Sequence, residues 1–336
     1  MMVRLAGGVN LVYLPGVRSC TMDVRSIRRA LLALLVVTII WGWTFSWMKE
    51  AIETAETVIP NALVFVIGLF MTLRFAMASM LMPLVLKGAR EQIGTKKVWK
   101  DGGILAGFLL GGFLLQMFGL DGVDPAVSAF LTSLYVAFTA LISGLVNREW
   151  PGKVAVAGVI IVTVGAATIS GPPQLTFGVS EWLTVFCALL FAGHIFFTDR
   201  ITKRSPPLAV ALVSFVWVTL GSLVLLGVGS LMHPEVEWAA AVQLLKTPGF
   251  IRPVLLAGLL GTLVALSLLT NFQRFLSPVR AAILFSLEPV WAAIIAVVVG
   301  QTQIDGWLLF GGGALLVGNL WMEIWPRTRF AKGSAA

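Results

Sequence analysis

A carboxylate followed by a proline interrupts one of the longest apolar stretches of this sequence. The stretch covers 277–305 and carries Glu288-Pro289 near its middle. Proline has no N–H to donate, and its ring clashes with the carbonyl four residues earlier, here that of Phe285. In a bilayer, a carboxyl group and a broken backbone ladder are both costly unless they face protein or a wet cavity. The stretch therefore predicts a membrane helix whose middle faces protein or a cavity.

The composition supports a membrane protein. Of the 336 residues, 58% are hydrophobic and 12% are charged. A soluble domain of this length could not bury so much apolar surface. The net charge of +8 comes from Lys and Arg between the apolar runs, where it indicates membrane orientation and not nucleic-acid binding. Cys20 and Cys187 suggest neither a disulfide framework nor a metal site. We expect an all-α integral membrane protein, with the lipid bilayer as its first partner.

Ten apolar runs approach the length of about 20 residues that a helix needs to cross the hydrocarbon of a bilayer. They lie at about 30–48, 61–86, 102–120, 125–146, 151–170, 180–199, 207–230, 253–273, 278–300 and 306–325. With the N-terminus in the cytoplasm, the outer segments hold only three basic residues, Lys49, Lys246 and Arg252. The positive-inside rule then predicts ten transmembrane helices with both termini cytoplasmic.

An internal repeat divides the chain into halves. Sequences that start at Pro125 and at Pro278 share the pattern P-x-x-(small)-A-φ-L-x-S-L, with φ apolar, and place Tyr135 opposite Glu288. With five spans per half, the second half must enter the membrane upside down. Inverted repeats of this kind are typical of transporters whose site lies near the midplane, so a central cavity is expected between the halves.

The expected organisation is a cytoplasmic tail over 1–29, a first repeat over 30–171, a second repeat over 172–326 and a cytoplasmic tail over 327–336. Met22, just before the first apolar run, is a candidate for the true translation start.

Four segments, spread over both halves, carry a family resemblance. They are Trp41-Gly42 followed by Phe45, Arg74-Phe75, RAAILFSLEPVWAAI over 280–294, and GGGALLVGN from Gly311. Through them the chain resembles the ten-helix EamA-like branch of the drug/metabolite transporter superfamily. The resemblance implies a carrier of the cytoplasmic membrane, that is the inner cell membrane, often an exporter of amino acids or other small metabolites.

The chain departs from this family pattern at two places. Tyr135-Val136 stands where the first half often repeats the proline, and Gln301-Thr302 stands where the second half often ends in Gly-Glu. These departures argue against an equivalent site in each half.

Glu288 is the leading candidate for a functional side chain. It would bind a substrate amine or carry a proton; the alternative is a structural role in which it bonds backbone groups loosened by Pro289. Pro289 is expected to bend the helix and to act as a hinge. Tyr135 is the repeat counterpart of Glu288, so the two are predicted to meet at the midplane.

Arg74 and Trp43 are further candidates for the cavity. Arg74 lies too far from either end of its run to reach water easily, so it should face protein or water. It would hold a substrate carboxylate, tie helix ends or carbonyls, or partner Glu288. Trp43 should stack with Trp47, four residues later. A tryptophan wall suits amphipathic, aromatic or cationic substrates, and plain helix packing is the alternative.

Gln116, His194 and Asn271 are polar groups inside other predicted spans. They are candidate cavity residues, and hydrogen bonds between helices are the alternative. His194 is also of a type that titrates near neutral pH.

The sequence offers no enzyme motif: the spans contain no G-x-S-x-G, no HExxH and no aspartyl pair. No cofactor or metal is therefore expected.

The function predicted is secondary transport by alternating access, with export of amino acids or amphipathic compounds. The expected partners are a small-molecule substrate, with protons and a second copy of the chain as further candidates. The alternative is a passive channel or a non-transporting receptor of the same fold.

Overall fold

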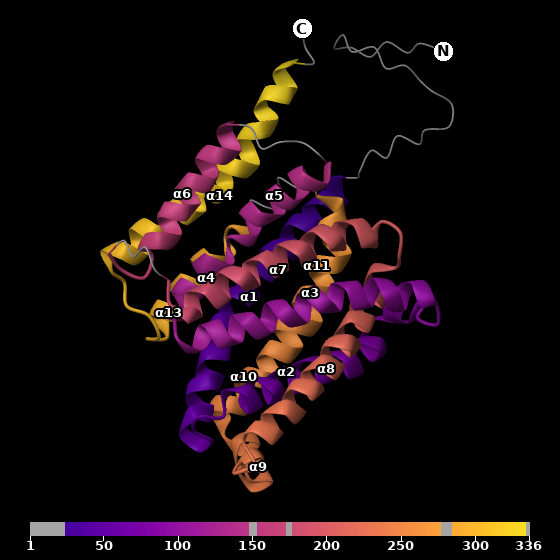
Figure 1. Cartoon of the computed structure of the whole chain (residues 1–336). Helices are drawn as coiled ribbons and strands as arrows, with labels where there is room; N and C mark the ends of the chain where they lie inside the picture. Colours follow the sequence, from indigo (N-terminus) through magenta and orange to yellow (C-terminus); the bar gives the residue numbers. More distant parts are fainter. Residues whose placement is uncertain (1–23, 148–152, 173–176, 277–283, 334–336) are drawn as a thin grey trace.

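The computed structural model describes residues 24–147, 153–172, 177–276 and 284–333, and these residues form helices joined by turns. The helices, labelled as in Figure 1, are α1 (Val24–Val58), α2 (Leu63–Val85), η1 (Lys87–Arg90), α3 (Lys96–Asp121), α4 (Pro125–Thr132), α5 (Tyr135–Asn147), α6 (Lys153–Thr168), α7 (Val179–Thr202), α8 (Pro207–Met232), α9 (Trp238–Lys246), α10 (Pro248–Leu256), η2 (Ala257–Val264), α11 (Ala265–Phe272), η3 (Gln273–Phe275), α13 (Glu288–Val298) and α14 (Gly306–Gly333). The predictions made for Met22 and Pro278 lie outside the described residues.

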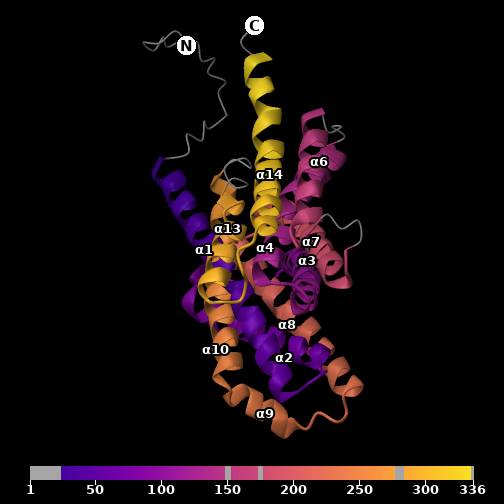
Figure 2. The same ribbon diagram turned by 90° about the vertical axis from the view of Figure 1, so that its left-hand side faces the viewer.

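Seven helical segments in the described part of the chain are long and apolar enough to cross a membrane. They are Arg28–Val58, Leu63–Val85, Lys96–Asp121, Pro125–Val146, Val179–Thr202, Pro207–Met232 and Pro248–Phe275. Three shorter apolar helices, Val156–Thr168, Glu288–Val298 and Gly306–Trp321, occupy the remaining predicted runs. The expected all-helical, multi-pass fold is thus confirmed. The sequence analysis missed α9, a short helix that crosses one end of the molecule (Figure 2).

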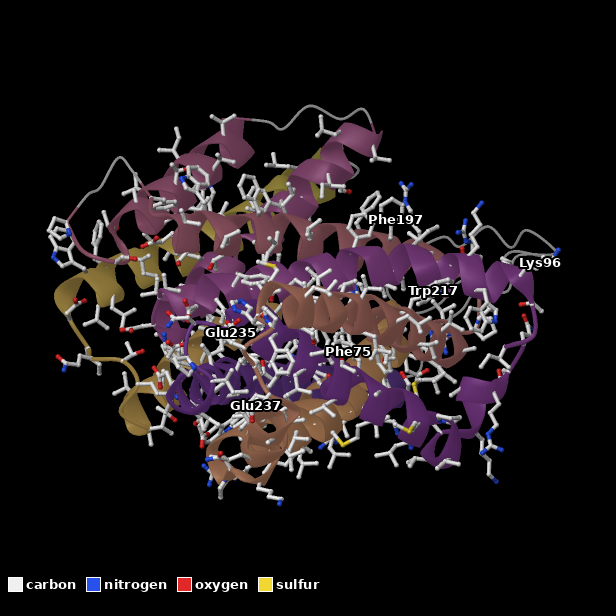
Figure 3. The ribbon with its side chains drawn as sticks, turned by 60° about the horizontal axis from the view of Figure 1, so that its bottom comes forward. Phe75, Lys96, Phe197, Trp217, Glu235 and Glu237 are labelled. Atoms are coloured by element: carbon white, nitrogen blue, oxygen red, sulfur yellow. The ribbon has the colours of Figure 1, made fainter. Side chains whose placement is uncertain are left out.

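Large apolar side chains cover the outside of the bundle. On α8, Val224 and Leu231 are 69% and 83% exposed, as expected for side chains that meet lipid tails and not water. The charged residues Lys96, Glu235 and Glu237, labelled in Figure 3, are exposed at or just beyond helix ends. This distribution separates an apolar flank from polar ends, which is what a bilayer requires of a multi-pass protein.

The two halves pack with their counterpart helices antiparallel. Gly165 near the end of α6 meets Gly311 near the start of α14, and Gly68 in α2 meets Leu226 near the end of α8. A Cβ added at Gly311 would lie 2.8 Å from the carbonyl oxygen of Gly165 in α6 and 2.6 Å from the Cα of Ile169 just after it, so glycine is what allows this approach. The other contacts also occur in matched pairs, α1 with α10 and α3 with α7. This packing agrees with two halves of opposite orientation.

Helix α1 connects the halves. It contacts α3 and α4 of its own half and α10, α11 and α13 of the other. Helix α1 therefore lies against both halves, and α4 and α13, which carry the two interrupted segments, lie beside it (Figure 1).

Candidate functional site

Both repeats are interrupted at the same Ser-Leu pair. In the first half α4 ends at Thr132 and α5 begins at Tyr135; in the second half α13 begins at Glu288, after a turn at Ser286 and Leu287. Sequence analysis predicted one continuous helix over 278–300 bent by a proline. The structure corrects this, since Pro289 lies in the first turn of a new helix. Proline suits that position because the first N–H groups of a helix have no partner within the helix.

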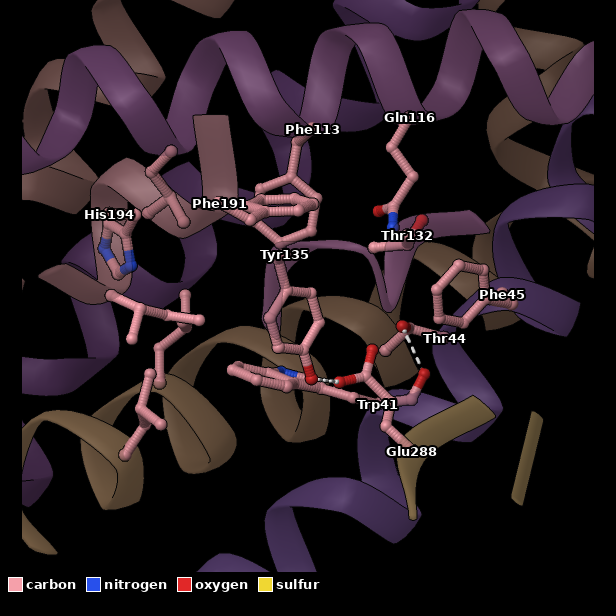
Figure 4. Close-up of a pocket in the computed structure, with 14 residues that line it drawn as sticks. Trp41, Thr44, Phe45, Phe113, Gln116, Thr132, Tyr135, Phe191, His194 and Glu288 are labelled. Atoms are coloured by element: carbon pink, nitrogen blue, oxygen red, sulfur yellow. Dashed lines mark hydrogen bonds between the residues drawn. The ribbon is translucent and has the colours of Figure 1, made fainter. Parts of the chain in front are cut away.

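Tyr135 and Glu288 are hydrogen-bonded across the two halves, as Figure 4 shows. The Tyr135 hydroxyl donates to Glu288 Oε2 at 3.0 Å and lies 3.3 Å from the carbonyl oxygen of Phe285. That carbonyl is the one that Pro289, which has no N–H, cannot bond. Tyr135 and Glu288 are 4% and 6% exposed. One phenol therefore serves both polar groups that the Glu-Pro pair leaves in the membrane interior.

The matching break in the first half is held by Asn319 of α14. Its Nδ2 donates to the Ser133 carbonyl oxygen and lies equally close, at 3.1 Å, to the Ser133 hydroxyl. Asn319 is fully buried. The sequence analysis did not select it, although it ends the Gly-rich segment that starts at Gly311, and an amide next to that glycine ridge was the available signal.

A cavity of about 50 Å³ lies beside the Tyr135–Glu288 pair. Figure 4 shows the side chains that surround it. The lining residues are Trp41, Thr44, Phe45, Leu109, Phe113, Gln116, Thr132, Tyr135, Phe191, His194, Ile195, Leu266, Leu269 and Glu288. The candidates Glu288, Tyr135, Gln116 and His194 are thus brought together, with His194 across the pocket from the carboxyl group. Glu288 is the one acidic residue among these lining residues, and none of them is Lys or Arg.

Trp43 does not line this cavity. It is 37% exposed and stacks on Trp47, with ring centroids 5.9 Å apart, which confirms the predicted stacking of the two rings. Trp41 lines the cavity instead, together with Thr44 and Phe45. Helical geometry explains the difference, because positions three and four residues apart share a face and positions two apart do not.

Arg74 and Asn271 also lie outside the cavity lining. Asn271 is partly exposed on α11, whose Leu266 and Leu269 face the cavity instead. Arg74 is fully buried, with its guanidinium 4.2 Å from the ring centroid of Phe113. It forms no ion pair with Glu288 among the described residues. The structure thus separates the buried arginine from the buried acid.

Arg74 and Trp41 instead hold the π-helical segment η2. Arg74 Nε donates to Thr262 Oγ1 at 2.7 Å, and that hydroxyl donates to the Ala257 carbonyl oxygen at 3.0 Å. Trp41 Nε1 donates to the carbonyl oxygen of Gly261 at 3.1 Å. Since π-helical turns shift the carbonyl pattern and are frequent at functional sites, these donors fix an irregular wall next to the cavity.

Within the described residues, no group of three or more His, Cys, Asp and Glu side chains has an arrangement that could hold a metal ion. The chemistry on offer at the cavity is one carboxyl group, a phenol, an imidazole, an amide and two threonine hydroxyls, between aromatic rings. This set can bind and release a small molecule and can exchange a proton. It contains no nucleophile with an adjacent base.

Two similar helical halves around a buried polar cavity define a multi-pass membrane protein of the transporter class. The chain belongs to the EamA-like transporter family, whose model matches residues 28–171 and 179–323. The resemblance seen in the sequence is confirmed. The protein is therefore a membrane transporter, with the lipid bilayer and small-molecule substrates as its partners.

The relatives support the same class. An uncharacterized transporter of Archaeoglobus fulgidus is 30% identical over 271 residues, which cover 80% of this chain and 77% of the relative. A solved crystal structure with 18% sequence identity has a TM-score of 0.51 and covers 87% of this chain and 98% of its own. That second likeness concerns the fold alone.

Proposed function

We propose that the protein is a secondary carrier of the inner cell membrane that exports small amine-bearing metabolites, amino acids or amphipathic compounds, by alternating access. Ten spans arranged as two inverted halves, with both termini in the cytoplasm, would enclose the cavity. The observation that carries the proposal is the buried hydrogen bond between Tyr135 of one half and Glu288 of the other. A bond across the halves at a cavity is sensitive to any rocking motion between them.

The size of the cavity favours a carrier over a passive channel, the alternative function. A volume of about 50 Å³ is far below the 300 Å³ or more that pockets for drug-sized ligands have. A substrate would need the surrounding helices to move apart. We interpret this arrangement as a closed state of a cycle in which the cavity opens to one side at a time.

The lining supports amine-bearing substrates in particular. Glu288 supplies a negative group, and Trp41, Phe113 and Phe191 supply ring faces that attract cations and apolar groups. Arg74 lies against the Phe113 ring and outside the lining, so the cavity wall itself offers no cation for a carboxylate. The amine end of a substrate is therefore the part that the cavity recognises.

Counterflow in proteoliposomes tests the proposal. Vesicles preloaded with an unlabelled panel of amines, amino acids and nucleosides should accumulate the labelled form of at least one compound. A Glu288→Gln variant should lose exchange or lose its pH dependence. The carrier proposal fails if labelled compounds equilibrate without transient accumulation, which is the behaviour of a channel. Proton coupling fails if Glu288→Gln transports normally with the same pH profile.

A further inference from the structure

A second cavity lies at the other end of α4 from the central one. It has a volume of about 220 Å³ and lies where α4, α7 and α14 begin. Its lining includes Asp124, Glu181 and Asp305, and no Lys or Arg. Thr302 also lines it, is 8% exposed, and has no partner for its hydroxyl in the described part of the chain. A buried, unpartnered hydroxyl beside three carboxylates indicates a place that a polar ligand visits.

The charge of this cavity selects the kind of ligand. Asp305 caps α14 by accepting the Leu308 N–H at 2.7 Å, and Asp124 and Glu181 add further negative charge. The ammonium group of Lys49, on α1, donates hydrogen bonds to the carbonyl oxygens of Leu120, Asp121 and Val123. The three carboxylates outweigh the single ammonium group of Lys49 and the partial positive charges at the starts of α4, α7 and α14, so the net charge around the cavity is negative and favours a cation.

Only a thin wall separates the two cavities. Val127 of α4 lines the polar cavity and Thr132 of the same helix lines the central one, about 8 Å apart at 1.5 Å per residue. Phe45, Ala129 and Ala292 form a small buried cluster of their own, separate from the main core. Phe45 also lines the central cavity, and Ala129 lies on α4 between Val127 and Thr132, so this cluster lies along α4 between the two cavities.

Unpartnered polar atoms accompany this wall. The hydroxyl groups of Ser46, next to Phe45, and Ser128, next to Ala129, are buried without a hydrogen-bond partner in the described residues. Gln301 bonds the carbonyl oxygen of Ser46 through Nε2 at 3.1 Å, while its Oε1 has no partner. Buried polar atoms without a hydrogen-bond partner are rare in protein interiors. They are expected where water or a substrate passes during part of a cycle.

We propose that the polar cavity is a second binding subsite for the positively charged amine group of the substrate, and that Phe45 closes the path between it and the central cavity. The inference rests on the proposed carrier function and adds a route to it. Substrate leaves Glu288, passes the displaced Phe45 ring, and meets Asp124 and Glu181 before release.

Thiol accessibility tests the subsite without requiring transport. A Thr302→Cys variant in proteoliposomes should react about tenfold faster with a cationic methanethiosulfonate reagent than with an anionic one. Phenethylamine, used as the probe amine, should slow the reaction. Adding Glu181→Gln should reduce the ratio of the two rates, and the unsubstituted chain measures the background from Cys20 and Cys187. Equal rates for the two reagents, or no reaction with either, would overturn the subsite.

A second pair of variants tests the gate. Because Cys187 Sγ lies 3.6 Å from Thr132 Oγ1, this test uses a Cys187→Ser background. There Thr132→Cys should react about tenfold faster with the cationic reagent when Phe45→Ala is added. Phe191→Ala is the matched control, since Phe191 lines the central cavity and is not part of the wall. Equal acceleration by both alanine variants would refute Phe45 as the gate. Elution as a single peak in detergent checks that each variant is folded, and labelling that behaves as expected without counterflow would refute the carrier function alone.

Discussion

Replacing Tyr135 with phenylalanine should weaken the contact between the halves while the ring stays in place. The ring packs edge-on against Phe285, with centroids 6.4 Å apart, and phenylalanine can keep that contact. The lost hydroxyl leaves the Glu288 carboxyl group without this donor and the Phe285 carbonyl oxygen without the donor that compensates for Pro289. The variant thus isolates one polar group.

The expected loss can be bounded from two directions. Hydrogen bonds between membrane helices contribute about 0.6 kcal/mol on average. Leaving a buried polar group unsatisfied costs about 1–3 kcal/mol. Because Glu288 is only 6% exposed, water can replace the phenol poorly, and we expect the second range. The free energy of unfolding of Tyr135→Phe should therefore fall by about 1–3 kcal/mol.

Unfolding in mixed micelles of mild detergent and SDS, followed by circular dichroism, measures this quantity. Thr163→Val is the control, because Thr163 is exposed and its hydroxyl bonds the Val159 carbonyl oxygen of its own helix. A double-mutant cycle with Glu288→Met should give a coupling energy of about 0.5–3 kcal/mol. Additivity within about 0.5 kcal/mol would show that the two side chains do not act as a pair.

Three further outcomes follow from the buried contacts. Arg74→Lys should destabilise the protein more than Arg74→Met does, by about 1–3 kcal/mol in the same unfolding assay. Lysine keeps a buried positive charge but lacks the planar N–H donors of the guanidinium, whereas methionine buries no charge. Gly311→Val should cost about 1–3 kcal/mol and Gly313→Ala little, since an added Cβ meets the α6 backbone only at the first position. Trp41→Phe should slow counterflow and Trp43→Phe should not, because only Trp41 lines the central cavity.

The repeat alignment was enough to predict that Tyr135 and Glu288 meet at the centre of the molecule. It matched Tyr135 with Glu288 because the two segments share a sequence pattern, and equivalent residues of an inverted repeat meet where they lie close to its pseudo-two-fold axis. The same reasoning could not find Asn319. Its partner, Ser133, belongs to a different segment, and no periodicity relates an amide on α14 to a turn after α4.

The choice between neighbouring candidates required the fold. From the sequence, Trp41 and Trp43 are equally plausible cavity residues. The rotation of α1 about its axis decides which of them lines the cavity. Arg74 and Glu288 are both charges in apolar runs. Only the packing of α2 against η2 shows that Arg74 serves a π-helical turn and not the acid.

By itself, the sequence determined the membrane class, most of the helical segments, the two halves and the acid at the centre, because these follow from run length, charge placement and local pattern along the chain. The tertiary structure decided which faces turn inward, that Glu288-Pro289 begins a helix instead of bending one, and that one phenol serves both the acid and the carbonyl that the proline leaves unbonded. The physical reason is that hydrophobic patterning fixes each helix as an element. Its rotation and its partners depend on close contacts between residues far apart in sequence.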